Sequence, residues 1–576
     1  MCTSEMSENS DSKDLVSSDG KDASDSGTRN RVTFDDVLVE LGEFGTYQKI
    51  FYFLFSVPFV VSSMQLLGWV FVGANLPHRC RFPDEPTDLE TPGNFDFVSD
   101  TYVSVDGCSY INLISNETLT CDLGYIYDTS IIGDSVVKDW DLICDRKSWR
   151  ATIGAAPMVG YLIGGLLTGY QSDKFGRKPT FISSIFLLFV SGLATAFVPG
   201  FFSFTLARSV VGYAIAGIDN TCFTMGLELV GPSKRTLAGI ACWFFETSGL
   251  LCAVALAFLL SNNWRLLQIC YSLPCIIFIS YWWFAPESIR WLIGQGKREE
   301  AKHLIQKSAH MNKVNLSDGL IEDMENTLEE EMEEEESRTY TFVDLFRYPQ
   351  MRIKSVIILI CWLVCPALYY VLLLDQSEIS TNPHIGFFIT CAVQIPGYIF
   401  VIFTLERKTF GRKRSQCAYL LLTGLMLIVH PLVPEECYWL RISFSIFGRF
   451  CANCAYTVLN LYSAELYPTV VRGVGIGSSY VISRVGTILS PYLLLLGEMS
   501  PIIFGSGAFL AGISALLLPE TLGKPLPETL LDGERMQRVI LPFCKDSDNP
   551  LDTIKSAMQS EKSPFKRNLQ RDDSKC

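Results

Sequence analysis

Apolar residues gather into long runs along most of this chain, and short polar segments separate the runs. A helix needs about 20 such residues to cross the ~30 Å hydrocarbon core of a bilayer. Twelve runs fit, at residues 49–74, 149–170, 179–198, 202–226, 237–260, 265–285, 353–374, 385–404, 415–433, 438–460, 473–497 and 501–518. The tenth is the least apolar, because it carries Arg441 and Arg449. The pattern predicts an all-α membrane protein with twelve transmembrane helices.

The polar segments divide this chain into regions with different expected surroundings. We expect an N-terminal tail at 1–48, the first span at 49–74, a long loop at 75–148, spans 2–6 within 149–285, a linker at 286–352, spans 7–12 within 353–518, and a C-terminal tail at 519–576. Lysine and arginine occur in the loops after spans 2, 4 and 8, whereas 375–384 and 498–500 carry none. Basic residues favour the cytoplasmic side, which predicts a multi-pass membrane protein with both termini and the linker cytoplasmic. The membrane we expect is the plasma membrane.

The loop at 75–148 is then extracellular. It contains four cysteines, which permit two disulfides with three connectivities, all open at this point: Cys80, Cys108, Cys121 and Cys144. It also contains Asn116-Glu117-Thr118, an N-glycosylation acceptor. Both features are typical of a segment outside the cell.

Charge and motifs exclude several classes of function. The net charge of −14 comes largely from the N-terminal tail and from the acidic run at 322–336, which we interpret as solvated segments. No basic face indicates a nucleic-acid partner. No phosphate loop, metal-binding histidine spacing or nucleophile motif is present, so we expect neither an enzyme nor a metal or cofactor. A coupling ion, either sodium or a proton, stays open, as does association into a homo-oligomer.

Three sequence elements recur at nearly equal offsets. DKFGRK (173–178) resembles part of ERKTFGRK (406–413), and Phe175 and Phe410 are 235 positions apart. Glu228 and Glu465 are separated by 237 positions, and PESIRWL at 286 precedes PETLGKPL at 519 by 233. The chain is therefore predicted to contain two copies of a six-span unit, an arrangement suited to alternating access around a central site.

The repeated charges lie at the predicted cytoplasmic ends of helices. We expect them to pair between helices when the cytoplasmic gate is closed, although they could also serve only to orient the spans. The candidates are Asp173 and Arg177, Glu228 with Arg235, and Glu465 with Arg472.

The chain resembles the organic cation, carnitine and organic anion transporter family of the major facilitator superfamily over about residues 34–530. The motifs that carry the resemblance include DKFGRK, PESIRWL, AELYPTVVRGVG (464–475), SPYLLLLG (490–497) and PETLGKPLPET (519–529). This resemblance implies a twelve-span fold, a large glycosylated extracellular loop, and transport of small organic ions as substrates.

Three charged residues fall near the middle of predicted spans. Asp219 precedes Glu228 by nine residues, Glu246 follows Arg235 by eleven, and Arg484 follows Arg472 by twelve. At ~1.5 Å per residue they lie roughly 13–18 Å from the cytoplasmic ends of their helices. An ionised side chain at that depth costs several kcal/mol, which makes it a candidate for binding. A structural ion pair between Arg484 and one acid is the alternative.

Arg484 lies in SSYVISRVGTILSPY (478–492), which resembles the carnitine and anion transporters, whereas the cation-selective members have Asp at the matching place. Gln394 stands where relatives often carry an acid. Trp362 and Tyr369 match aromatic positions of the family, and Tyr398 is a further candidate for an aromatic cage around a cationic group.

The sequence thus favours a transporter of organic cations or zwitterions, in which an acid binds the amine and Arg484 binds the carboxylate. An organic anion exchanger and a non-transporting sensor on a transporter fold are the alternatives.

Overall fold

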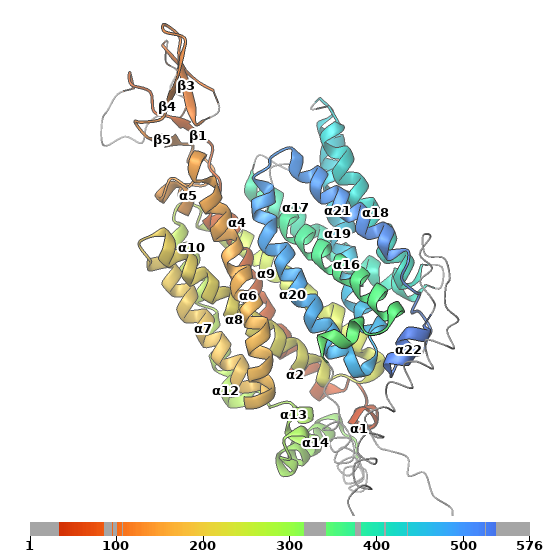
Figure 1. Cartoon of the computed structure of the whole chain (residues 1–576). Helices are drawn as coiled ribbons and strands as arrows, with labels where there is room; N and C mark the ends of the chain where they lie inside the picture. The colour runs from red at the N-terminus through yellow and green to blue at the C-terminus, as the bar shows by residue number, and fades with distance from the viewer. Residues whose placement is uncertain are drawn as a thin grey trace, which may run out of the picture.

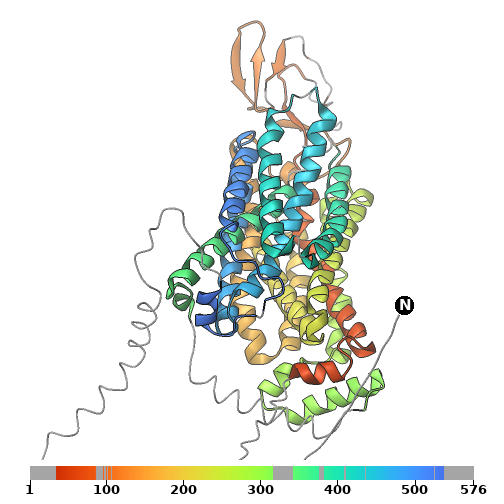
Figure 2. The same ribbon diagram turned by 90° about the vertical axis from the view of Figure 1, so that its right-hand side faces the viewer.

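A computed structural model describes residues 34–85, 95, 99, 101–105, 107–315, 341–374, 382–407, 410–434, 436–524 and 526–536 of the protein. The N-terminal tail before residue 34, the acidic run at 322–336 and the C-terminal segment 562–576 lie outside the described residues. The remainder forms a helical bundle with a small group of strands at one end and three short helices at the other (Figures 1 and 2). We call these the strand end and the opposite end.

Two groups of long helices make up the bundle, and each predicted span coincides with one helix or with two or three consecutive ones. The first half contains α2 (Thr46–Ser56), α3 (Pro58–Leu67), α4 (Trp69–Val72), α6 (Lys147–Phe175), α7 (Arg177–Phe197), α8 (Phe201–Glu228), α9 (Arg235–Leu259), α10 (Trp264–Ser272), α11 (Cys275–Ile279) and α12 (Tyr281–Phe284). The second half contains α16 (Pro349–Leu374), α17 (Pro383–Glu406), α18 (Gly411–Val429), α19 (Tyr438–Leu466), α20 (Thr469–Leu494) and α21 (Met499–Ala515).

Ten spans among the described residues are long and apolar enough to cross a membrane. The two predicted spans outside that set are α20, which carries Arg472, Arg484 and several serines, and α21, which is a shorter apolar helix of 17 residues. Arg484, with Tyr480 and Thr487 of the same helix, lines the central cavity described below, which explains why a charged residue lies in the middle of α20.

Glycines let the helices of each half approach closely. A Cβ atom on Gly160 of α6 would lie 1.7 Å from the carbonyl oxygen of Ser209 in α8. A Cβ atom on Gly486 of α20 would lie 2.2 Å from the carbonyl oxygen of Leu363 in α16. Small residues at such crossings allow backbones to pack in van der Waals contact within a bilayer. The bundle therefore depends on glycine at these two crossings.

The segment between α4 and α6 contains five short strands. The strands β1 (His78–Cys80) and β5 (Tyr125–Tyr127) pair antiparallel, and β2 (Tyr102–Ser104), β3 (Ser109–Asn112) and β4 (Glu117–Thr120) form an antiparallel meander. Two disulfides, Cys80–Cys121 and Cys108–Cys144, select one of the three predicted connectivities. The second connects the meander to the residues just before α6.

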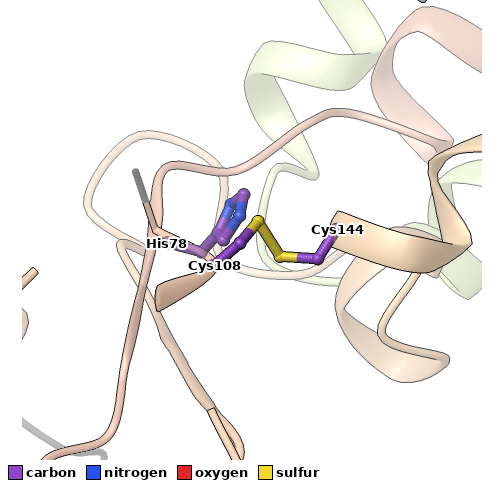
Figure 3. Close-up of side chains that lie close together, drawn as sticks. All are labelled: His78, Cys108 and Cys144. Atoms are coloured by element: carbon purple, nitrogen blue, oxygen red, sulfur yellow. A yellow bond between two sulfur atoms is a disulfide. The ribbon is translucent and has the colours of Figure 1, made fainter. Parts of the chain in front are cut away.

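His78 lies beside the Cys108–Cys144 disulfide (Figure 3). The two sulfur atoms are bonded to each other, so neither is a thiolate that could bind a metal with His78. Asn116 lies in the turn between β3 and β4, where its side chain is exposed and its φ is positive at 54°. The predicted glycosylation acceptor is thus in an accessible turn.

Three short helices pack together at the opposite end. They are α1 (Phe34–Glu40), α13 (Ile289–Gly294) and α14 (Arg298–Asn312). Phe34, Val37 and Leu38 of α1 bury their side chains in a cluster with residues of α13 and α14. The Asp35 carboxylate accepts two hydrogen bonds from the Arg235 guanidinium, at 2.6 and 2.9 Å. The N-terminal segment is therefore docked on the first half.

A further short helix, α22 (Leu530–Arg535), docks on the second half through reciprocal polar contacts with α16. The Glu534 carboxylate accepts hydrogen bonds from the backbone N–H groups of Gln350 and Met351, at 3.1 and 2.9 Å. These groups belong to the first turn of α16, where a carboxylate is favourable. In return, the buried Lys354 of α16 donates to the carbonyl oxygens of Gly533 and Met536, at 2.9 and 2.5 Å.

Replacing Lys354 with methionine is expected to destabilise the purified protein by about 1.5–3 kcal/mol, the usual range for hydrogen bonds to a charged group. Methionine fills similar space but leaves the carbonyls at the end of α22 without a donor. The measurement is the thermal unfolding of detergent-solubilised protein. Arg535→Ala, an exposed change on the same helix, is the matched control. Equal unfolding temperatures for Lys354→Met and wild type would contradict this account.

Candidate binding site in the central cavity

A cavity of about 240 Å³ lies between the two halves near the middle of the bundle. Its wall includes residues of α3, α6, α8 and α9 from the first half and of α16, α19 and α20 from the second. Three charged side chains line it, Asp219, Glu246 and Arg484. The structure therefore brings the three predicted intramembrane charges to one cavity.

Arg484 projects from α20 toward the first half. Its guanidinium carbon lies 3.7 Å from the centre of the Tyr161 ring on α6, within the range of a cation–π contact. Its Nη1 atom is 4.0 Å from the Met158 sulfur, and its buried Nε has no hydrogen-bond partner in the described part of the chain. Arg208 on α8 also has an unpartnered Nε, but its Nη1 and Nη2 atoms donate to the carbonyl oxygens of Gln65 and Leu66. The terminal nitrogens of Arg484 have no oxygen acceptor among the described residues, and so they retain donor capacity that Arg208 uses within the fold.

Asp219 on α8 contacts the same tyrosine. The Tyr161 hydroxyl donates to Asp219 Oδ2 at 3.2 Å, and Asp219 Oδ1 is buried with no hydrogen-bond partner among the residues described. Tyr161 therefore joins the acid to the base through its hydroxyl and its ring face. Within the described ranges, Arg484 forms no ion pair with Asp219 or Glu246. This structure therefore does not contain the structural ion pair between Arg484 and one acid that was the alternative to a binding role.

Glu246 on α9 lies beside a group of aromatic rings, two from the second half and one from α9 itself. Its Oε1 lies 3.5 Å from the Tyr369 hydroxyl, which is also 3.4 Å from Gln394 Oε1 and can donate to one of the two at a time. The centre of the Tyr369 ring is 5.4 Å from that of Tyr456, and Trp243 of α9 is 5.8 Å from Tyr456. A carboxylate next to several ring faces is a suitable environment for a protonated or quaternary amine.

Three further predicted residues lie one layer behind the cavity wall. The Trp362 indole N–H donates to Ser463 Oγ at 2.8 Å, and its ring packs 4.9 Å from that of Tyr480. Gln394 Oε1 accepts from Thr247 at 2.9 Å and from Tyr398 at 3.2 Å. Trp362 and Tyr398 therefore support the residues that line the cavity, and Gln394 joins α9 to α17.

Tyr161, Tyr456 and Tyr480 line the cavity but were not among the predicted site residues. Tyr161 had a weak signal, since it is the one hydroxyl-bearing aromatic residue in APMVGYLIGG (156–165). Tyr480 also had a signal, because it precedes Arg484 by four residues and so shares its helix face. Tyr456 had none, because tyrosines are frequent in this chain and only the fold shows which ones face inward.

Paired charges at the opposite end hold helices of the first half together. Arg177, at the start of α7, lies 3.5 Å from Glu228 of α8 and 3.4 Å from Asp173. The Glu287 carboxylate accepts the backbone N–H groups of Arg177 and Lys178, at 3.0 and 3.1 Å. Burial raises the pKa of Glu287 above its usual value, although these N–H groups oppose the shift.

The second half repeats this arrangement. Arg412, at the start of α18, lies 3.0 Å from Glu465 of α19. The Glu520 carboxylate accepts the backbone N–H groups of Arg412 and Lys413, at 2.8 and 3.1 Å. Arg412 was not among the predicted gate residues, although the offset of 235 from Arg177 was a signal that could have found it.

The pairings of Glu228 with Arg235 and of Glu465 with Arg472, predicted for a closed cytoplasmic gate, are not formed in this structure among the described residues. Arg235 binds Asp35 of α1, and Glu228 is bound by Arg177. Arg472 donates to the Tyr467 carbonyl and to Thr469 Oγ1, both at 3.2 Å. The reason is that Arg177 and Arg412 begin the helices that pack beside the two glutamates, while Arg235 and Arg472 turn toward neighbouring backbone or the N-terminal helix.

Contacts between the halves are found at the strand end. The Tyr370 hydroxyl of α16 donates to the Gly154 carbonyl of α6 at 2.8 Å, and Tyr492 of α20 contacts Thr152 of α6 at 3.1 Å. The His384 ring of α17 stacks on Phe71 of α4 with centres 5.1 Å apart. These contacts close the bundle between the cavity and the strand end.

Two groups of long apolar helices around one charged cavity are the architecture of a membrane transporter, and the comparisons agree. The family described as Sugar (and other) transporter matches residues 99–530. The chain is similar to the xylose transporter XylE from E. coli in a partially occluded inward open conformation, with a TM-score of 0.55, 16% identity and coverage of 86% of this chain and 99% of the other. This likeness shows the fold alone.

Relatives identify the family. The chain is 37% identical to the organic cation transporter protein of Drosophila melanogaster, over 88% of this chain and 96% of that protein. It is 34% identical to solute carrier family 22 member 13 of Homo sapiens, over 87% and 93%, and 32% identical to human organic anion transporter 3, over 87% and 94%. The chain belongs to the organic cation, carnitine and organic anion transporter family of the major facilitator superfamily. It is a transporter and not an enzyme.

Proposed function

We propose that the protein transports small organic cations or zwitterions that carry an amine, such as carnitine-like solutes, by alternating access. The observation that carries this proposal is the presence of two acids and one arginine in the same cavity, with no ion pair between them among the residues described. Acids favour an amine, and an arginine with unused donors favours a carboxylate.

The aromatic rings support an amine as the common feature of the substrates. Tyr369, Tyr456 and Trp243 surround the side of the cavity that carries Glu246. Each ring face near a cation contributes about 0.5–2 kcal/mol. The names of the relatives include both cation and anion transporters. They therefore support transport of organic ions, and the sign of the substrate's charge has to be inferred from the residues of the cavity.

An organic anion exchanger is the second candidate. It is favoured by Arg484, whose Nε has no partner within the described residues, and by the similarity to organic anion transporter 3. An anion, however, would have to enter a cavity that contains Asp219 and Glu246. Two carboxylates repel an anionic substrate, and we therefore place the cation or zwitterion first.

The same proposal assigns a location and a role to the two ends of the bundle. The strand end faces outward from the plasma membrane and carries a glycan on Asn116, while both termini face the cytoplasm. Asp173, Arg177, Glu228, Arg235, Glu465 and Arg472 form the cytoplasmic gate region, together with Arg412. Pairs within each half would keep that half rigid as the two halves rock against each other.

Uptake into cells that express the protein tests the proposed function. Labelled tetraethylammonium, carnitine and a dicarboxylate are offered with and without sodium, and cells without the protein are the control. We expect carnitine or tetraethylammonium to enter faster than in control cells and the dicarboxylate not to. Entry of the dicarboxylate alone would support the anion exchanger, and no entry of any of the three would overturn the proposal.

A further inference from the structure

The charged residues of the cavity do not match a substrate that has one amine and one carboxylate. Asp219, Glu246 and Arg484 are its charged lining residues in the described part of the chain, and together they carry a formal charge of −1. A substrate with one amine and one carboxylate matches Arg484 and one acid, and leaves the other acid unmatched. An ionised carboxylate without a partner in a low-dielectric site is costly, so the second acid must either take up a proton or meet a second cationic group of the substrate.

The two acids have different surroundings, which indicates different partners. Asp219 and Arg484 both contact Tyr161, one through its hydroxyl and the other over its ring face. Glu246 lies 3.5 Å from the Tyr369 hydroxyl on another part of the wall, near Tyr456. One tyrosine therefore joins an acid and a base into a single subsite, and the second acid belongs to a separate aromatic subsite.

We propose that the preferred substrates carry two cationic groups and one carboxylate, as basic amino acids such as ornithine, lysine and arginine do. This inference rests on the proposed function and makes its substrate class more specific. The carboxylate binds Arg484, the neighbouring α-ammonium group binds Asp219, and the distal cation binds Glu246 among the aromatic rings. The net charge of +1 on such a substrate balances the cavity.

The Tyr161 subsite has the chemistry that an amino-acid head group requires. The ammonium and carboxylate of an α-amino acid are bonded to the same carbon atom, so their receptors must be close neighbours. Arg484 Nε is buried and has no hydrogen-bond partner among the described residues, and the Asp219 carboxylate is approached there by two hydroxyl groups, those of Tyr161 and Ser62, and by no cationic group that pairs with it. The Tyr161 hydroxyl donates to Asp219 Oδ2, and the Tyr161 ring packs against the guanidinium of Arg484. Tyr161 thus acts as a positioning residue for both side chains.

The side-chain subsite explains why a distal cation is favoured over a distal apolar group. Glu246 is the cavity acid that Tyr161 does not contact, and its bond to the Tyr369 hydroxyl is long at 3.5 Å. Tyrosine and tryptophan faces beside it favour a cation, including one with several alkyl substituents. A substrate with an apolar side chain would leave Glu246 unmatched.

Competition on the wild-type protein tests this inference without a variant. Uptake of labelled carnitine is measured in the presence of unlabelled ornithine or norvaline, which has the same number of side-chain carbons but no distal amine. We expect ornithine to inhibit at a concentration at least about tenfold lower than norvaline. Equal inhibition by the two compounds, or none by ornithine, would overturn the inference while carnitine uptake still supports the proposed function.

A variant locates the distal subsite. Glu246→Gln is expected to lower the ratio of the inhibitory concentration of norvaline to that of ornithine by about tenfold, because only ornithine has a distal cation to lose its partner. Glu498→Gln, the same change at an exposed position outside the cavity, is expected to leave this ratio unchanged. An unchanged ratio in Glu246→Gln would overturn the assignment of Glu246 to the distal cation. If wild-type protein carries neither carnitine, tetraethylammonium nor ornithine, the proposed function itself fails.

Discussion

Replacing Arg484 with alanine is expected to lower the ratio of carnitine uptake to tetraethylammonium uptake by roughly 10–100-fold, which corresponds to about 1.5–3 kcal/mol for a hydrogen bond to a charged group. The physical reason is that the carboxylate loses the guanidinium that binds it, while a substrate without a carboxylate loses no direct contact. Without Arg484, the cavity also becomes more negative, and this favours a cation over a zwitterion.

The measurement is uptake of both labelled compounds, normalised to the amount of protein at the cell surface. Arg484→Lys is the informative companion, since lysine keeps the charge but cannot make two parallel hydrogen bonds to a carboxylate. We expect its ratio to lie between those of wild type and Arg484→Ala. Arg484→Ala protein that reaches the surface and retains the wild-type ratio would show that Arg484 has a structural role only.

Replacing Arg412 with alanine is expected to destabilise the protein by on the order of 2–4 kcal/mol, because it removes one partner of a largely buried ion pair. The guanidinium of Arg412 contacts both Glu465 oxygens and also donates to the Leu405 carbonyl at 2.8 Å. The side chains of Arg412 and Glu465 are only 15% and 16% exposed, so water cannot fully replace the lost contact.

Thermal unfolding of purified protein measures this effect, and Arg407→Ala is the matched control, because Arg407 is an exposed arginine in the same connection between α17 and α18. The exchanged double variant, Arg412→Glu with Glu465→Arg, should recover part of the lost stability. An Arg412→Ala protein as stable as the control would mean that the pair contributes little to the second half.

The hydrophobic pattern predicted the helices well because a bilayer imposes a simple rule on length and polarity. Each of the twelve predicted spans coincides with helical segments, even where α20 is too polar to stand out on composition. The strands β1–β5 were not predicted, since they are three or four residues long and are held by two disulfides whose connectivity no spacing specifies.

Depth along a helix could be counted from the sequence, but the direction of a side chain could not. Counting from the helix ends placed Asp219, Glu246 and Arg484 at similar depth, and all three line the cavity. Trp362 is seven residues from Tyr369 on one helix face, yet it lies behind the wall because Tyr456 and Tyr480 from α19 and α20 cover it. Packing of other helices decided which aromatic residue faces the cavity.

The ion pairs show a similar limit. Repeat offsets identified Glu228 and Glu465 as equivalent positions, but the nearest arginine in the sequence was the wrong partner for each. The correct partners, Arg177 and Arg412, are about 50 residues away and are brought close by helix packing. Asp35 could not be linked to Arg235 from the sequence, because that contact depends on how α1 docks at the opposite end.

Exchange of labelled carnitine across proteoliposomes that contain only the purified protein tests the central claim most directly, since no other transporter or binding partner is present. The account predicts saturable flux in wild-type vesicles that excess tetraethylammonium inhibits, because both compounds use the cavity of Asp219, Glu246 and Arg484. Flux no faster than in protein-free vesicles, or carnitine flux that tetraethylammonium does not affect at any concentration, would contradict it.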